Sequence, residues 1–408
     1  MTHRPEITLG FQPLVDSAVL IAAAEIGFAA DEDVTLTLSR GGSWDDILED
    51  VASGKLQGAH MPAPLPVAVN LGLLANAPPL VAPIAFGLGG NAVTVSIALH
   101  AEMSQQGLLT DLDPAAAGAA LRAVIAARRS QGAPLIKISV AHRFSGHHYE
   151  LRYWLSACGI DPDGDVDLIV LPSQQTVEAL AERQIDACCV GEPWSTIATD
   201  RGLGRVVTVK SAIWRDSPEK VLGLSKPWAD DNPQLVDALL RALQHAADWC
   251  AHPANIEQLA GILGARLALP GEWMLPALSR AARQSGFSRF GKHSTRTIRR
   301  KPGTFPWQSH ALWCYSQMVR WGDCDHTPGN MQTARDSYRP DLYRRGLKPI
   351  FAPMPGANMK VEGALREPQH VGASHAAFVL GPDGFFDGRI FDPDCLEDYI
   401  LCQCPPKN

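Results

Sequence analysis

Apolar and polar positions along the first half of the chain follow a repeating order of short strands and longer helices. Residues 7–9 and 34–38 have the pattern of strands, and residues 17–26 have the Ala-rich apolar face of a helix. Ser43 stands before the helical segment 45–51, where a serine suits the N-cap. This rhythm predicts an α/β fold with a mainly parallel, doubly wound sheet.

The first block continues with strands expected over 80–85 and 93–98, and residues 59–64, which contain two prolines, are expected to form a loop. A second α/β block follows the first. The second block is expected to contain helices and strands in turn, over residues 114–129, 136–140, 149–158, 166–171, 174–183, 187–190 and 206–209. The pattern then becomes helical, over residues 234–251, 255–263, 273–284 and 309–321.

Two α/β blocks with a return crossing predict two lobes around a ligand-binding cleft. The expected division is residues 1–94 for the first segment of lobe I and residues 95–208 for lobe II. Residues 209–408 are expected to return to lobe I and to add a helical, C-terminal extension. The polar run 287–304, whose basic residues include Arg296, Arg299, Arg300 and Lys301, is expected to be a solvated loop.

Composition narrows the range of functions. The chain has 408 residues, 46% of them hydrophobic and 19% charged, which is enough to bury large cores. A formal net charge of −7 argues against direct contact with nucleic acid, although a local site can still attract a small anion. No signal peptide, transmembrane-length apolar run or lipidation motif is visible, so a cytoplasmic location without membrane attachment is expected.

The chain lacks the usual signatures of catalysis and of cofactor binding. No P-loop, dinucleotide fingerprint or Gly-x-Ser-x-Gly elbow is present. The spacing of His60, His142, His147 and His148 fits no common zinc pattern. The nine cysteines are expected to be reduced thiols. We therefore expect no enzyme activity, no metal and no cofactor.

Five short segments, far apart in the chain, instead offer hydrogen-bond donors. Each donor alone has an ordinary structural explanation, such as a core tryptophan, a turn asparagine or a solvated lysine. Together, neutral N–H groups with one full positive charge and few carboxylates suit a planar oxyanion such as nitrate, because more positive charge would favour sulfate or phosphate. The candidate ligand-binding residues are Trp44, Asn91, His147, Gly191 and Lys220.

The surrounding motifs resemble a known family. They include Gly41-Gly42-Ser43-Trp44-Asp45, Phe144-Ser145-Gly146-His147, Gly191-Glu192-Pro193-Trp194, Pro218-Glu219-Lys220 and Tyr338-Arg339-Pro340-Asp341-Leu342-Tyr343. The chain resembles, from about residue 6 to about residue 394, the nitrate- and bicarbonate-binding proteins of ABC importers and the cytoplasmic NasS-type nitrate/nitrite sensors.

The resemblance implies a two-lobed periplasmic-binding-protein type II fold with the anion between the lobes, held by the five residues given above. It also implies that Lys220 selects nitrate or nitrite, because the bicarbonate-binding relatives lack this cation and recruit a metal. Bicarbonate, moreover, carries an O–H group that needs an acceptor, and few acceptors are expected here.

Because no export signal is visible, the resemblance to the cytoplasmic sensors is favoured over the resemblance to the importer binding proteins. In the sensor branch the anion-free protein holds an ANTAR-domain antiterminator of the NasT type and releases it when nitrate or nitrite binds. Two alternatives stay open. One is an exported substrate-binding component of a nitrate, or less favoured bicarbonate, ABC importer. The other is an enzyme on the same fold, for which no nucleophile or general base is evident.

Overall fold

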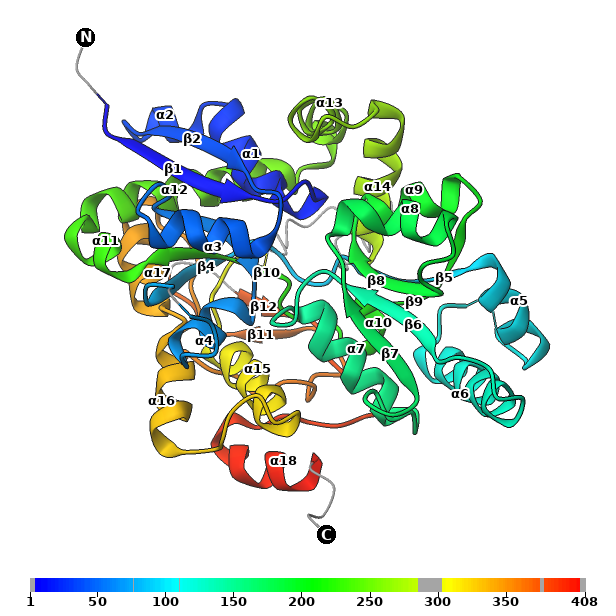
Figure 1. Ribbon diagram of the computed structural model, residues 1–408. Helices are drawn as coiled ribbons and strands as arrows, with labels where there is room; N and C mark the ends of the chain where they lie inside the picture. The colour runs from blue at the N-terminus through cyan, green and yellow to red at the C-terminus, as the bar shows by residue number, and fades with distance from the viewer. Residues whose placement is uncertain (1–3, 76, 110, 285–302, 375–377, 404–408) are drawn as a thin grey trace.

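Two five-stranded sheets form the centres of two lobes, as Figure 1 shows. This computed structural model describes residues 4–75, 77–109, 111–284, 303–374 and 378–403. Lobe I has the strand order β2-β1-β3-β10-β4, and lobe II has the order β7-β6-β8-β5-β9. The strands are β1 (Glu6–Phe11), β2 (Thr35–Arg40), β3 (Gly58–Pro62), β4 (Leu80–Ala85), β5 (Asn91–Ser96), β6 (Ile136–Val140), β7 (Val166–Val170), β8 (Ala187–Gly191), β9 (Gly204–Val209) and β10 (Lys220–Ser225).

One strand in each sheet runs against its neighbours. In lobe I it is β10, which pairs antiparallel with β3 and β4, and in lobe II it is β5, which pairs antiparallel with β8 and β9. Each of them has just crossed from the other lobe, so it enters its sheet at the end where the parallel strands finish. Asn91 therefore pairs with Gly191, and Lys220 pairs with Pro62.

The crossings between the lobes lie in residues 86–90 and 210–219, between β4 and β5 and between β9 and β10. The expected boundary after residue 94 falls inside β5, and the expected boundary after residue 208 falls at the last residues of β9. Periodicity alone did not assign these two strands to different lobes, because β4 and β5 are both short strands that are buried almost throughout.

The loop expected over residues 59–64 is wrong. Residues 58–62 form β3, which lies between β1 and β10 and is buried throughout. Pro62 is the last residue of this strand, and Pro64 precedes α4 (Leu65–Asn70). A proline is tolerated at both kinds of position, because little or no backbone N–H is needed there. The two prolines thus mark the end of a strand and the start of a helix.

Helices cover both faces of each sheet. Apolar residues of β1 pack with α1 and α12 in one core, while α3 and α4 pack on the other face in a core that continues into lobe II. Besides α4, the helices before residue 285 are α1 (Ala18–Glu25), α2 (Phe28–Asp31), α3 (Trp44–Ala52), α5 (Ile97–Gln105), α6 (Pro114–Ser130), α7 (Gly146–Ala157), α8 (Thr176–Ala181), α9 (Trp194–Asp200), α10 (Lys210–Ile213), α11 (Lys226–Asp231), α12 (Pro233–Cys250), α13 (Ile256–Leu267) and α14 (Gly271–Gln284).

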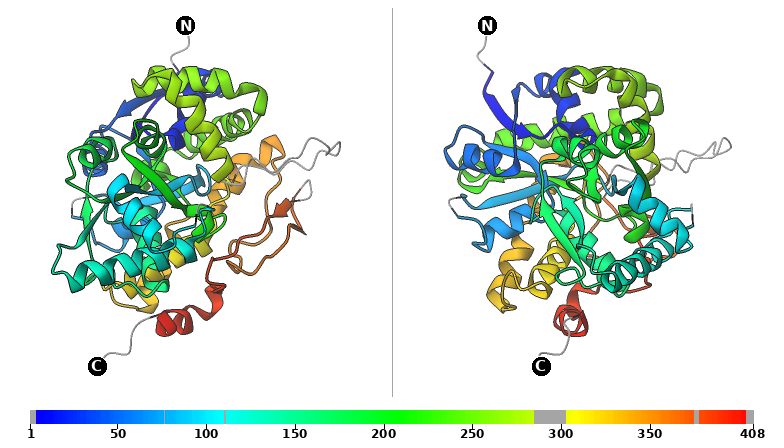
Figure 2. Two further views of the ribbon diagram at one scale, coloured as in Figure 1. Left: turned by 90° about the vertical axis from the view of Figure 1, so that its right-hand side faces the viewer. Right: turned by 45° about the vertical axis from the view of Figure 1, so that its right-hand side comes forward.

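The C-terminal extension, residues 303–403, contacts both lobes. Helix α15 (Gln308–Arg320) packs against α4 of lobe I and α7 of lobe II, and lies between them in Figure 1. Figure 2 shows the extension along one side of the molecule, ending at α18 near the C-terminus. Its other elements are α16 (Pro328–Asp336), α17 (Pro340–Leu347), β11 (Gln369–Val371), β12 (Phe378–Leu380) and α18 (Leu396–Gln403).

Two tyrosines of α7 fix the extension to lobe II. The hydroxyl of Tyr149 donates to Asp323 Oδ2 at 2.8 Å, and the hydroxyl of Tyr153 donates to Asp387 Oδ2 at 2.8 Å. The extension thus bridges the lobes instead of belonging to lobe I alone. Most of the polar run 287–304 lies outside the described residues. Among the described residues, no helix has the length and apolar character needed to span a membrane.

Candidate anion-binding site

Asn91 and Gly191 stand side by side at the edge of lobe II. Asn91 begins β5 and Gly191 ends β8, and the two residues are partners in the antiparallel ladder. A Cβ atom at position 191 would lie 3.1 Å from Asn91 Oδ1 and 3.4 Å from a methyl carbon of Leu14 in lobe I. The absence of a side chain at Gly191 therefore keeps room beside the asparagine amide where the two lobes meet.

His147 is the second residue of α7, and its helix start is fixed by Ser145. The hydroxyl of Ser145 accepts a hydrogen bond from the backbone N–H of His148 at 3.2 Å, which is an N-cap contact. The imidazole of His147 is almost fully buried, and its Nε2 atom lies 3.1 Å from Glu219 Oε1. Burial and the neighbouring Lys220 and Lys210 lower the pKa of His147, although Glu219 opposes this shift.

Lys220 begins β10, and its ammonium group is buried between two carboxylates. Lys220 Nζ donates to Asp16 Oδ2 at 2.7 Å and also to Glu219 Oε1. Burial alone would lower the pKa of Lys220, but Asp16 and Glu219 outweigh it and raise the pKa above its usual value. The lysine is therefore fully charged at neutral pH, as the sequence analysis assumed, but it is not solvated.

Trp44 lies beside His60, which in turn contacts Asp16, the partner of Lys220. The tryptophan is the first residue of α3, whose start is fixed by reciprocal hydrogen bonds between Ser43 and Asp46. The buried indole ring lies 6.0 Å from the ring of His60, centroid to centroid, and His60 Nε2 lies 3.1 Å from Asp16 Oδ1. All five sequence-predicted residues thus come to one region between the lobes, Trp44 at one side of it.

A carboxylate occupies the centre of that region. The two oxygens of Glu219 accept hydrogen bonds from Asn91 Nδ2, His147 Nε2, Lys210 Nζ and Lys220 Nζ. Burial acts to raise the pKa of Glu219, but Lys210, Lys220 and His147 together hold it well below its usual range. The expectation of few carboxylates is therefore wrong: three of the predicted donors are already bound to an ionised side chain of the protein.

Lys210 is a second buried cation, so the expectation of a single positive charge is also wrong. Lys210 Nζ donates to Pro218 O at 2.7 Å and to Glu219 Oε2 at 2.6 Å, and lies 2.9 Å from Glu150 Oε1. Burial, with a contribution from Glu219, raises the pKa of Glu150 to about 8 in spite of Lys210. Glu150 is hence mostly protonated at neutral pH. The region contains two ammonium groups and two ionised carboxylates, those of Asp16 and Glu219.

Among the buried polar atoms at the site that have no hydrogen-bond partner in the described part of the chain are Asn91 Oδ1 and His147 Nδ1. A carboxylate can only accept, so the amide nitrogen of Asn91 must face Glu219 and its oxygen must face away. Acceptors are therefore available beside the predicted donors. The argument that bicarbonate is disfavoured for lack of an acceptor does not hold for this arrangement.

Sequence reasoning assigned no role to Asp16, His60, Lys210, Glu150 and Glu219. A usable signal was present, since Glu219 adjoins the buried strand β10 and Lys210 directly follows the apolar end of β9. Ionisable side chains at the carboxyl ends of buried strands, or at the start of a crossing strand, tend to face the interlobe region in this topology.

Contacts at the rim hold the lobes together around the site. The backbone N–H of Val15 donates to Glu192 O at 2.8 Å, and Gln174 Nε2 donates to Gly42 O at 2.9 Å. His142 Nε2 lies 3.4 Å from Asp45 Oδ1, and this hydrogen bond lowers the pKa of Asp45. The segment that contains Trp44 is thus held to lobe II on both sides, which is a closed arrangement of the lobes.

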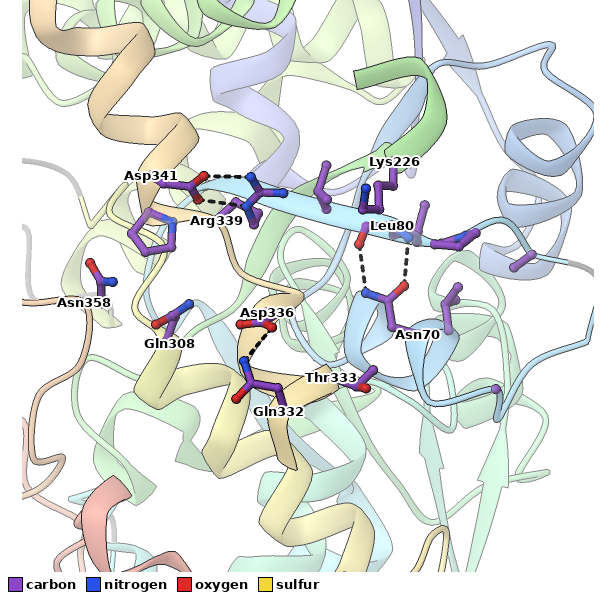
Figure 3. A pocket seen from close by; sticks show the side chains of 16 residues that line it. Asn70, Leu80, Lys226, Gln308, Gln332, Thr333, Asp336, Arg339, Asp341 and Asn358 are labelled. Carbon is purple, nitrogen blue, oxygen red and sulfur yellow. Dashed lines mark hydrogen bonds and ion pairs between the residues drawn. The ribbon is translucent and has the colours of Figure 1, made fainter. Parts of the chain in front are cut away.

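An open cavity of about 740 Å³ lies elsewhere, between lobe I and the extension (Figure 3). Several of its polar side chains are paired with one another or with backbone: Arg339 binds Asp341 through two hydrogen bonds, and Asn70 binds the backbone of Leu80. No residue of the predicted anion site lines it. Among the described residues, no group of three or more His, Cys, Asp or Glu side chains is placed to hold a metal ion.

The architecture defines the class of protein: a two-lobed fold of the periplasmic-binding-protein type. It aligns with the crystal structure of the periplasmic nitrate-binding protein NrtA from Synechocystis PCC 6803 with a TM-score of 0.79 and 24% identity, over 98% of each chain. This likeness concerns the fold.

Sequence comparison shows the family. The profile of the NMT1-like family matches residues 2–264, and the chain belongs to this family. It is 30% identical, over 97% of its length and 85% of the relative, to the nitrate/nitrite binding protein NrtA of Synechococcus elongatus. It is also 31% identical, over 97% of its length but 54% of the relative, to the nitrate import ATP-binding protein NrtC of Synechocystis.

Proposed function

We propose that this protein binds nitrate or nitrite, without catalysis, at the buried charge cluster between its lobes. The observation that supports this most directly is the convergence of Asn91, His147, Gly191 and Lys220, from separate elements, around Glu219. Relatives over nearly the whole chain are nitrate/nitrite binding proteins. A monoanion would be bound by N–H groups that Glu219 does not use, or would exchange with the Glu219 carboxylate at those it does.

We further infer that the protein is a cytoplasmic sensor: its anion-free form holds an ANTAR-domain antiterminator of the NasT type and releases it when nitrate or nitrite binds. The resemblance of the site motifs to NasS-type sensors supports this role. The bridging extension supports it as well, because α15 contacts α7, whose second residue is His147, and can transmit a change at the site to the outer surface. The anion can shift the lobes only by binding one arrangement better than the other.

A second function is favoured by the relatives themselves. The matched proteins include both a nitrate/nitrite binding protein and a nitrate import ATP-binding protein. The same site would then deliver the anion to an ABC importer instead of controlling an RNA-binding regulator. The two functions share the anion chemistry and differ in the partner.

Isothermal titration of the purified protein with nitrate, nitrite and bicarbonate tests the anion. We expect saturable binding of nitrate or nitrite by the wild-type protein and unchanged binding by a Lys226→Ala variant, which alters the open cavity of Figure 3 and not the cluster. Trp44→Ala is expected to weaken binding without changing selectivity between anions of different charge. Absence of saturable binding of any of the three anions would refute the proposal.

Co-purification tests the partner. An ANTAR-domain protein from the same organism is expected to elute with the anion-free chain in size-exclusion chromatography and to separate from it when nitrate or nitrite is added. Lys220→Ala is expected to remain in the complex when the anion is added. If the two proteins never associate, while the chain binds a transporter in membrane vesicles, the importer function replaces the sensor.

A further inference from the structure

The buried cluster contains as many ionised acids as ammonium groups. The pairs are Lys220 with Asp16, at 2.7 Å, and Lys210 with Glu219, at 2.6 Å. Glu219 also contacts Lys220, so the four groups form one chain of charges across the lobes. Burial of this kind is tolerated only when the charges compensate one another.

The remaining titratable groups around Glu219 are neutral or nearly so at pH 7. Burial keeps Glu150, on α7, mostly protonated, since its pKa is raised to about 8. Burial also lowers the pKa values of His147 and of His148, the two histidines at the start of α7. His60, on β3, faces Asp16 and not Glu219. The unliganded cluster of two lysines and two carboxylates is therefore close to neutral.

We propose that Glu219 and Asp16 determine the specificity of this site for ligand charge: by cancelling Lys210 and Lys220 before the ligand arrives, they admit an anion with one negative charge and exclude sulfate and hydrogen phosphate. This inference rests on the proposed nitrate function and assigns the carboxylates a role in specificity. Because the four charges cancel, the cluster supplies no net positive charge to offset the loss of hydration of the ligand, and that loss costs more for a dianion than for a monoanion.

The test compares nitrate and sulfate binding in charge variants. Glu219→Gln alone allows Glu150 to ionise beside Lys210 and so to restore neutrality, because these groups lie 2.9 Å apart. The informative variant is therefore Glu150→Gln with Glu219→Gln, which leaves one net positive charge. We expect its sulfate affinity, relative to nitrate, to rise roughly tenfold or more over wild type.

A charge-conserving variant separates charge from geometry. Lys210→Met with Glu219→Gln removes one pair and leaves the cluster neutral, so the preference for nitrate over sulfate is expected to persist. Glu362→Gln is a matched control, because Glu362 is another fully buried glutamate paired with a lysine, Lys360, but lies in the extension. It is expected to leave both affinities unchanged.

Asp16→Asn provides a second route if the double glutamine variant does not fold. It also adds one net positive charge, at a partly exposed side chain, and is expected to shift the sulfate-to-nitrate ratio in the same direction. Circular dichroism and thermal melting verify that each variant is folded.

Three results would overturn the inference. One is a wild-type protein that binds sulfate as well as nitrate; another is a folded variant with added positive charge that still rejects sulfate. The third is loss of the nitrate preference in the charge-conserving variant. A wild-type protein that binds neither nitrate nor nitrite would remove the proposed function and this inference together, which distinguishes that failure from the other three.

Discussion

Nε2 of His147 lies 3.1 Å from Oε1 of Glu219, and this contact determines what the other side of the imidazole ring presents. A carboxylate accepts only, so the ring carries its hydrogen on Nε2. A neutral ring then has no hydrogen on Nδ1, which is buried and has no partner among the described residues. For His147 to donate to an anion through Nδ1, the ring must take up a proton.

The first prediction is that nitrate affinity falls as pH rises through and above the lowered pKa of His147, by up to about tenfold per pH unit. The pKa of His147 is lowered in the unliganded protein, and the bound anion raises it, so binding takes up a proton between these two values. Titrations in buffers with different ionisation enthalpies measure the number of protons taken up.

His147→Gln is the matched variant for this prediction, because glutamine offers N–H groups that do not titrate. Its affinity is expected to be weaker and independent of pH. Glu150→Gln, which removes a different titratable group beside Lys210, is expected to keep the wild-type dependence. A pH-independent affinity in the wild-type protein would show that Nδ1 does not donate to the anion.

The second prediction concerns Lys220. Lys220→Ala is expected to abolish measurable nitrate binding and to lower the free energy of unfolding by about 3 kcal/mol, because it leaves Asp16 and Glu219 without one of their buried partners. Calorimetric titration and urea unfolding measure the two effects separately.

A double variant distinguishes the ligand role of Lys220 from its structural role. Lys220→Met with Asp16→Asn removes the buried ion pair as a unit, so much of the lost stability is expected to return. Nitrate binding is expected to stay lost, because the ammonium group is still absent. Recovery of binding in the double variant would mean that Lys220 only supports the fold and that the anion is bound elsewhere.

Strand and helix order could be predicted from the sequence because most elements carry their own local signal. The alternation of residues 34–38 and the serine before α3 identify β2 and the N-cap of α3, and the structure has both. The family motifs likewise pointed to residues that the fold does bring together, such as Asn91 and Gly191. Strand β3 was missed because its prolines were interpreted as breaks and not as boundaries.

The internal ion pairs could not be predicted in the same way. Lys210 and Glu219 are nine residues apart in the chain, and their contact arises because α10 and the start of β10 lie at opposite ends of the second crossing. Nothing local distinguishes a lysine buried by such a crossing from one on the surface. The sequence therefore indicated the donors but not that a carboxylate of the same chain already binds them.

The third prediction concerns the rim contacts of the closed lobes. Gln174→Ala removes the hydrogen bond to Gly42 O, and Asp45→Ala removes the contact with His142. Each is expected to weaken nitrate binding by less than about tenfold, mainly through faster dissociation, because both contacts are partly exposed. Stopped-flow measurement of Trp fluorescence gives the dissociation rate.

The Gln174 effect is expected to persist as salt increases, because its hydrogen bond to Gly42 O joins two uncharged groups. Asp50→Ala, on the same helix and paired with Lys55 at its surface, is the control and is expected to leave dissociation unchanged. Equal rates in wild type and in the double rim variant would show that these contacts do not hold the closed state.

The fourth prediction concerns Glu150 and the pH dependence of folding. Its pKa is about 8 in the folded protein against 4.5 for an ordinary glutamate, because burial disfavours the charged form. Between these two values the folded protein binds more protons at this position than the unfolded chain does, so the contribution of Glu150 to stability falls as pH rises through that range.

Glu150→Gln, which cannot ionise, is expected to remove this pH dependence of the free energy of unfolding. Urea unfolding at a series of pH values, with nitrate absent, measures it. If wild type and Glu150→Gln lose stability in parallel between about pH 5 and about pH 8, the carboxyl of Glu150 is ionised in the folded protein, and the charge balance of the cluster shifts by one.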